Sequence, residues 1–347
     1  MPRFRTAEVT EVLSQRRGLQ RLAVRMPDGS TARAYALTEL IGDAAVGDHV
    51  VLNTTAVDLG LGTGGWHFVH WNTSRDSLDV PGPEHIMKIR YTSLQSDVGT
   101  SELAHPEEAD RPLSGTPVVV CTVHSQVPLV ALGFASGMPG GRLAYVMTDG
   151  ASLPLAMSDL VASMLERGLL VGSVTAGHAF GGDLEAVTVA SALGLAAHVM
   201  NADAIVVGMG PGVVGTGTAM GTTAIEAASL LDTAAARGGV PVLCVRASEG
   251  DHRSRHAGVS HHIHTALALA SAAPLVAPEP AEVADLPGVR CVEPFEVPDP
   301  GDLQDAAGLD VTTMGRHHHE DPVFFRAAVA AGVLAATTAA DDTRAHD

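Results

Sequence analysis

The densest group of reactive side chains lies in the stretch EGDHRSRHAGVSHHIH, residues 249–264. Imidazole nitrogens and the carboxylate of Asp251 are ligands for zinc and other divalent ions, whereas Arg253 and Arg255 could clamp a phosphate through paired N–H donors. Neither an HExxH nor a CxxC spacing is present. In a purely structural interpretation, the histidines cap helices and the arginines pair with surface acids. The stretch therefore leaves three alternatives: a metal site, an anion site or neither.

Ser260 has the position of a helix N-cap for the following run HHIHTALALASAA. This placement puts two histidines in the first turn of a predicted helix. The candidates from this stretch are His256 and His261 for proton transfer, Arg253, Arg255 and Ser260 for ligand binding, and His262 for a metal.

A second candidate is the glycine-rich stretch GMGPGVVGTGT, residues 208–218, between an apolar run and a predicted helix. Gly210, Gly212 and Gly215 have the spacing of a dinucleotide-binding loop, where glycines let backbone amides approach an oxyanion at a helix N-terminus. We include Thr216 with these glycines as candidate ligand-binding residues.

Three features weaken a nucleotide assignment for this loop. Pro211 removes one amide donor, and no lysine follows the glycines as in a P-loop. The first acidic residue suited to a ribose, Glu249, follows Gly215 by roughly thirty-four residues instead of the expected distance of about twenty. NAD(P) is thus disfavoured, while a phosphate or other anion and a structural tight turn both remain open.

Other loops offer further polar residues. His178 lies within TAGHAFGGD, residues 175–183, and is a candidate general acid or base. Asp183 is predicted to cap a helix beginning at Leu184, with metal binding as the alternative. Asp149, in TDGAS, is a candidate metal ligand, and His124 a candidate ligand-binding residue.

Several kinds of covalent chemistry have no support. The chain has no Gly-x-Ser-x-Gly elbow and no cysteine in these loops. Lys88 is the only lysine, which argues against a Schiff base or a P-loop lysine.

The elements that must position these residues fall into two regions. Residues 1–80 alternate between apolar and polar and are divided by turn pairs such as Asp28-Gly29, which predicts a small antiparallel β barrel or meander. Residues 81–116 are polar and proline-rich, which indicates a linker or extended segment.

Residues 117–337 have a different pattern, and 338–347 are predicted to be a flexible tail. Apolar runs of strand length recur at 117–123, 143–148, 169–176, 204–209 and 241–247, with shorter ones at 274–277 and 289–294. Runs with helical spacing separate them, so we predict an α/β domain with a mostly parallel sheet and crossover helices. Loops after parallel strands emerge at one edge. We therefore expect the loops at 124–126, 149–152, 175–183, 210–218 and 248–262 to meet there.

Composition restricts partners and location. The net charge of −18 argues against nucleic acid and anionic membranes as partners. The cysteines at 121, 244 and 291 are odd in number and widely spaced, which suits a reducing cytoplasm. We expect no transmembrane helix and no signal peptide, and a homo-oligomer is compatible with this composition.

Several stretches taken together resemble a known family. HIMKIRY, TDGASLPLAMSDLV, TAGHAFGGDLEAV, MGPGVVGTGT and RHAGVSHH are similar to a family of uncharacterised bacterial proteins, common in actinobacteria, that is defined as a domain of unknown function. The resemblance covers nearly the whole chain and implies a bacterial cytoplasmic protein with a shared site, but no reaction.

Three functions remain to be compared. The favoured one is a small-molecule enzyme or binder whose ligand carries a phosphate or carboxylate. The second is a divalent-metal hydrolase that uses Asp149, Asp183 and the histidines at 256, 261 and 262. The third is a non-enzymatic regulatory or scaffold protein.

Overall fold

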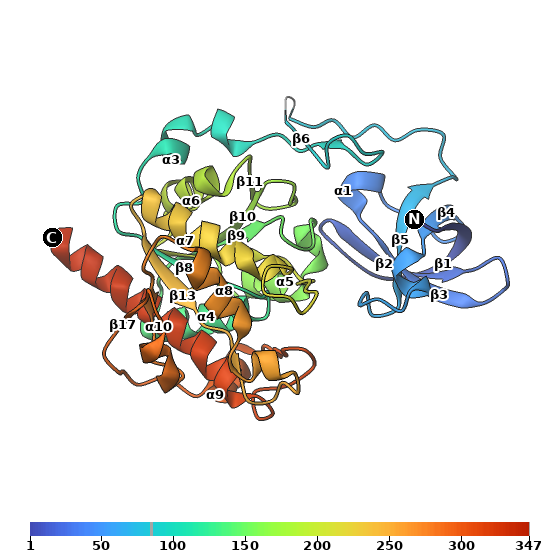
Figure 1. Ribbon diagram of the computed structural model, residues 1–347. Helices are drawn as coiled ribbons and strands as arrows, with labels where there is room; N and C mark the ends of the chain where they lie inside the picture. Colours follow the sequence, from blue (N-terminus) through green and yellow to red (C-terminus); the bar gives the residue numbers. More distant parts are fainter. Residues whose placement is uncertain (84–85, 347) are drawn as a thin grey trace. The chain divides into compact units, whose positions relative to one another are not determined.

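The computed structural model describes residues 1–83 and 86–346, with side chains as far as residue 341. The chain divides into two compact units, Met1–Gly99 and Thr100–Asp347, which are described separately (Figure 1). The narrower limits that the sequence suggests, at residues 80 and 116, stay predictions.

The first unit is a closed five-stranded barrel with the strand order β1-β2-β3-β5-β4. Alternate side chains point inward, which is why residues such as Val9, Leu22 and Leu52 are fully buried. All neighbouring strands are antiparallel except β3 and β5, which pair in parallel and make the barrel mixed. The elements of this unit are β1 (Phe4–Arg16), β2 (Leu19–Arg25), β3 (Thr31–Ala36), α1 (Thr38–Ile41), β4 (His49–Asn53), α2 (Thr55–Asp58), β5 (Trp66–Asn72), β6 (Met87–Lys88) and β7 (Ser96–Asp97).

The second unit is built on an eight-stranded sheet in which every described pair of strands is parallel. Its order is β11-β10-β9-β12-β8-β13-β16-β17. The strands are β8 (Pro117–Cys121), β9 (Leu143–Thr148), β10 (Gly172–Ala176), β11 (Leu184–Ala186), β12 (Ala204–Met209), β13 (Val240–Cys244), β16 (Leu275–Val276) and β17 (Arg290–Cys291). The predicted fold class, a parallel α/β domain preceded by a small β barrel, is confirmed.

Helices cover both faces of this sheet. Val119 and Cys121 of β8 point into one core cluster and Val118 and Val120 into the other, which explains why the strand is a continuous apolar run. The first face is covered by α4 (Gln126–Gly137), α5 (Asp159–Glu166), α9 (Pro300–Ala307) and α10 (Pro322–His346). The second is covered by α3 (Pro106–Asp110), α6 (Val189–His198), α7 (Glu226–Ala236) and α8 (His261–Leu269).

The long helix α10 packs closely against α4. A β-carbon on Gly133 would lie 2.1 Å from the carbonyl oxygen of Val329, and one on Gly332 would lie 2.1 Å from that of Val130. Among the described residues, Pro322–Asp341 is the one helical segment long and apolar enough to cross a membrane, but 67% of its most apolar window is buried within the protein. A helix in the core of a protein can be equally long and apolar. Residues 338–346, predicted as a tail, continue α10, and residue 347 lies outside the described residues.

One predicted helix start is wrong. Residues 184–186 form strand β11 beside β10, and α6 begins only at Val189, with Thr188 as its N-cap. The Asp183 carboxylate instead accepts hydrogen bonds from the backbone and hydroxyl of Ser173, each at 2.9 Å. Asp183 therefore anchors the edge strand and caps no helix.

Candidate functional site

The site lies where two loops emerge beside the central strand β8. β12 and β13 flank β8 in the sheet, so the segments after Met209 and Cys244 leave the same carboxyl edge. Ligands of open α/β sheets bind at this edge, where neighbouring connections leave in different directions.

The glycine-rich loop after β12 forms a hairpin instead of a turn into a helix. The Thr216 amide donates to the Gly221 carbonyl at 2.8 Å, and the Thr223 amide donates to the Val214 carbonyl at 2.9 Å. The helix α7 begins only at Glu226, after a short 3₁₀ turn. The glycines follow β12 and precede α7, as expected, but the hairpin separates them from the N-terminus of this helix, so the dinucleotide interpretation loses its structural basis.

Individual glycines in this loop have separate roles. A β-carbon on Gly210 would lie 3.0 Å from both the Met147 sulfur and the Ser152 carbonyl oxygen, so close packing requires glycine there. Gly212 and Gly217 have φ angles of +108° and +86°, a region that L-residues with side chains avoid.

The second wall comes from residues 246–262. A short antiparallel pair, β14 (Ala247–Ser248) with β15 (Gly258–Val259), closes a loop that carries the 3₁₀ turn Ser254–His256. The Ser260 hydroxyl then accepts a hydrogen bond from the His262 amide at 3.3 Å and caps α8, as predicted.

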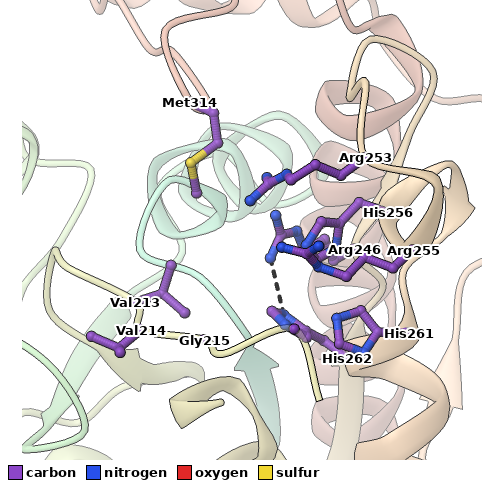
Figure 2. Close-up of a pocket in the computed structure, with 11 residues that line it drawn as sticks. Val213, Val214, Gly215, Arg246, Arg253, Arg255, His256, His261, His262 and Met314 are labelled. Carbon is purple, nitrogen blue, oxygen red and sulfur yellow. Dashed lines mark hydrogen bonds between the residues drawn. The ribbon is translucent and has the colours of Figure 1, made fainter. Parts of the chain in front are cut away.

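Between these two walls lies a cavity of about 180 Å³. Figure 2 shows the arginine and histidine side chains on one side of it and Val213, Val214 and Gly215 on the other. The lining residues are Val213, Val214, Gly215, Gly217, Arg246, Arg253, Arg255, His256, His261, His262 and Met314.

Three histidines form the floor of this cavity. The ring centroids of His256, His261 and His262 lie 4.4 to 5.0 Å apart. One ligand atom of each can be chosen so that all three lie within 4.8 Å of one another. The Nε2 atom of His261 is buried without a hydrogen-bond partner among the described residues, so it is available to a ligand in the cavity.

The surroundings keep these histidines neutral near pH 7. Burial, followed by the Arg246 charge, lowers the pKa of His256 to about 4 and that of His262 to about 3. Burial and then the Arg255 charge also lower the pKa of His261.

A hydrogen bond selects the tautomer of His262. An Arg246 guanidinium nitrogen lies 3.0 Å from Nδ1 of His262 (dashed in Figure 2). Because arginine can only donate, Nδ1 accepts and the neutral ring carries its proton on Nε2. The Ser260 oxygen lies 2.8 Å from Nδ1 of His256 and orients that ring. Since a hydroxyl both donates and accepts, this contact fits either tautomer of His256.

The positive charge in this region exceeds the negative charge. Arg253 forms a 2.6 Å ion pair with buried Asp251, and Arg316 pairs with buried Asp321 at 3.0 Å. The Arg253 side chain holds the pKa of Asp251 well below its usual range. Asp251 therefore stays ionised, and the two ion pairs balance two of the arginines.

Two other arginines lack such partners. Arg246 is 4% exposed, yet among the described residues no carboxylate lies within 4.0 Å of Arg246 or Arg255. Burial, and then repulsion by Arg253, lower the pKa of Arg246 to about 10, so its side chain is still charged at neutral pH. Asp251 and Asp321 favour its charged form without contacting it. A buried charge without a contacting counter-charge is costly, and an anionic ligand would relieve that cost.

The structure brings together about half of the residues proposed from the sequence. Those that line the cavity are Gly215, Arg253, Arg255, His256, His261 and His262. Ser260 lies behind them and orients His256 and His262. Thr216 belongs to the adjoining hairpin and Gly210 and Gly212 precede it, but none of the three lines the cavity.

His124 lies elsewhere, inside the protein. Its Nδ1–H donates to the Met209 carbonyl at 3.2 Å, and its Nε2 lies 2.7 Å from the hydroxyl of Ser158, the N-cap of α5. Burial lowers its pKa to about 4. Neutral His124 therefore connects the carboxyl ends of β8 and β12 to the N-terminus of α5.

The proposed metal ligands Asp149, Asp183 and His262 do not form one site. Asp149 follows the carboxyl end of β9 and accepts a 2.9 Å hydrogen bond from the His178 amide, whereas Asp183 binds Ser173 near the amino end of β10. A strand's length separates these two edges. His178 and Asp149 are also outside the set of residues that line the cavity.

Arg246, the residue that says most about the ligand of the cavity, was not among the candidates predicted from the sequence. Arg246 lies in VLCVRA, which the sequence pattern assigns to an apolar strand, although β13 ends at Cys244. A single arginine inside an otherwise apolar run is the signal that could have identified it, because an unpaired cation is seldom buried. Met314, from a distant loop, had no local signal.

These features define a two-unit protein, with a β barrel followed by a parallel α/β unit that has a cationic cavity at its carboxyl edge. The model of a family described as a protein of unknown function (DUF3866) matches residues 33–332. The chain belongs to this family, as the sequence resemblance predicts. No curated protein and no solved structure matches the chain.

Proposed function

We propose that the protein binds a small molecule with an anionic group, a phosphate or a carboxylate, in the cavity between residues 213–217 and 246–262. The observation that carries this proposal is the buried guanidinium of Arg246, which lines the cavity without a carboxylate partner among the described residues. Guanidinium groups bind oxyanions through two parallel N–H donors.

The cavity also has an apolar side. Val213, Val214 and Met314 face the cationic wall, so a ligand with an anionic end and an uncharged organic part matches both walls. The three imidazoles add donors and could transfer protons to a bound substrate. These features support binding first and catalysis by His256 or His261 as its extension.

A thermal-unfolding screen of the untagged protein tests this proposal. We expect sugar phosphates, nucleotides or small carboxylates to raise the unfolding temperature, because a ligand bound only by the folded state stabilises it. Arg246→Gln should remove the response, and Arg290→Gln, an exposed arginine far from the cavity lining, should retain it. If no anion stabilises the wild-type protein, the proposal is wrong, and the regulatory or scaffold function becomes the better explanation.

A divalent-metal hydrolase is the second candidate, because His256, His261 and His262 have the proximity of a metal site. The contacts of His262 speak against it, because Arg246 occupies the Nδ1 lone pair and the neutral ring carries its proton on Nε2, which leaves no lone pair on this ring for a metal. Metal analysis of protein purified without a tag decides this. A stoichiometric metal that a chelator removes would support the hydrolase.

We further propose a bacterial cytoplasmic setting with neither nucleic acid nor a membrane as a partner, and a homo-oligomer as the assembly to test. The net charge of −18 and the three free cysteines support this setting.

A further inference from the structure

We infer that the anionic group of the ligand is a dianionic terminal phosphate, as in a phosphate monoester, held by neutral histidines and two uncompensated arginines. This inference rests on the proposed function, because it specifies which anion the same cavity takes.

Charge is the first argument. Arg246, Arg253, Arg255 and Arg316 supply four positive charges, whereas Asp251 and Asp321 supply two negative ones. Two positive charges are left, on Arg246 and Arg255. A phosphate monoester carries close to two negative charges at neutral pH, while a carboxylate or a phosphodiester carries one.

The number of donors is the second argument. Arg246 and Arg255 present guanidinium N–H groups, and His262 presents Nε2–H. A terminal phosphate offers three acceptor oxygens, whereas a carboxylate has two oxygens in one plane. The larger set of acceptors matches the larger set of donors.

The close spacing of the histidines is the third argument. One nitrogen of each of the three rings lies within 4.8 Å of the others, so the three rings meet at one compact place in the cavity. A dicarboxylate has the same total charge, but it would need two separate centres. One tetrahedral anion satisfies both the charge and the convergence.

The charged surroundings of the histidines give the pH dependence. Arg246 and Arg253 oppose protonation of all three rings, and Arg255 and His264 oppose that of His261. The histidines also oppose one another's protonation, and Asp251 favours that of His256. The rings of His256 and His262 therefore stay neutral above about pH 5. Affinity should then follow the charge of the ligand, which loses its second negative charge near pH 6.

Titration calorimetry of the full-length untagged protein tests this inference with four probes: methyl phosphate, dimethyl phosphate, sulfate and acetate. At about pH 7.5 we expect methyl phosphate and sulfate to bind at least about tenfold more tightly than dimethyl phosphate and acetate, because they carry twice the charge. Lowering the pH to about 5 should weaken methyl phosphate about tenfold and change sulfate less than about threefold.

The outcomes separate the two proposals. Equal binding of acetate and methyl phosphate would overturn the dianion inference and leave anion binding intact, whereas absence of binding by all four probes would contradict both. Tighter binding of sulfate at lower pH would show that protonated histidines hold the anion, against the inference. Arg255→Gln, on an exposed side chain that tolerates replacement, should lower the methyl phosphate affinity about tenfold or more. Arg290→Gln is the charge-matched control.

Discussion

The buried side chain of His124 makes the free energy of unfolding depend on pH. In the folded protein its pKa is lowered from 6.5 to about 4 by burial. The unfolded chain therefore binds more protons than the native state between these values, so stability is lost as the pH falls through this window. For this one group the loss is about 2 kcal/mol at about pH 5 and about 3 kcal/mol at about pH 4.

His124→Gln isolates this contribution. Glutamine keeps a polar side chain but does not titrate, and the neighbouring phenol of Tyr145 stays neutral because burial raises its pKa. At neutral pH we expect the variant to be less stable by about 1–3 kcal/mol, because the hydrogen bonds to Met209 and Ser158 are disturbed. Between about pH 8 and about pH 5 the difference from wild type should shrink by about 2 kcal/mol.

Urea unfolding at a series of pH values provides the measurement. Both tryptophans, Trp66 and Trp71, lie in the unit Met1–Gly99, so their fluorescence does not report on the unit that contains His124. Far-UV circular dichroism does, since nearly all the described helices belong to the second unit. If the difference in the free energy of unfolding between wild type and variant stays constant with pH, His124 is not a buried neutral side chain.

Three further predictions follow from single positions. Arg246→Gln should abolish anion binding but lower the stability of the ligand-free protein by no more than about 1 kcal/mol, since it removes a buried unpaired charge and gives up one hydrogen bond to His262. Calorimetric binding and urea unfolding together check this. A loss of stability several times larger would show that the charge is structurally compensated. Gly133→Ala should destabilise the second unit by about 2–4 kcal/mol, because the new β-carbon meets the Val329 carbonyl; a thermal shift within error of wild type would contradict the close helix contact. Gly212→Ala should cost about 1–3 kcal/mol through its positive φ alone, because nothing lies within 4 Å of the added carbon; loss of methyl phosphate affinity with unchanged unfolding would instead assign Gly212 to the site.

The sequence predicts the fold better than the site because the two depend on different kinds of information. Continuous apolar runs such as residues 117–121 identify buried parallel strands, and a serine before a polar turn identifies the cap of α8. The cavity instead depends on how distant loops meet and on whether a charge finds a partner. Arg253 pairs with Asp251, two residues away, and Arg246 does not. The spacing of these residues in the sequence predicts neither the ion pair of Arg253 nor the lack of a carboxylate partner for Arg246.

The errors have a common physical origin. The glycine spacing at 210–215 is the same in a hairpin and in a dinucleotide loop, and only the hydrogen bonds from residues 214–223 distinguish them. Asp183 is as favourable before a helix as before an edge strand, and tertiary pairing of Leu184 with Val174 decides for the strand. In both cases the residues that decide between the alternatives lie outside the local sequence.

The cationic cavity has a kinetic consequence because it belongs to a strongly acidic chain. Far from the protein, an anion is repelled by the net charge of −18, because the two unpaired positive charges of the cavity act only at short range. At low salt, where the Debye length is roughly 30 Å, a dianion therefore approaches against the field of the whole chain, whereas at physiological salt, where it is roughly 8–10 Å, the charges near the cavity dominate. Association should accelerate as moderate salt screens the repulsion, the reverse of ordinary electrostatic steering, and long polyanions should be rejected before they reach the cavity.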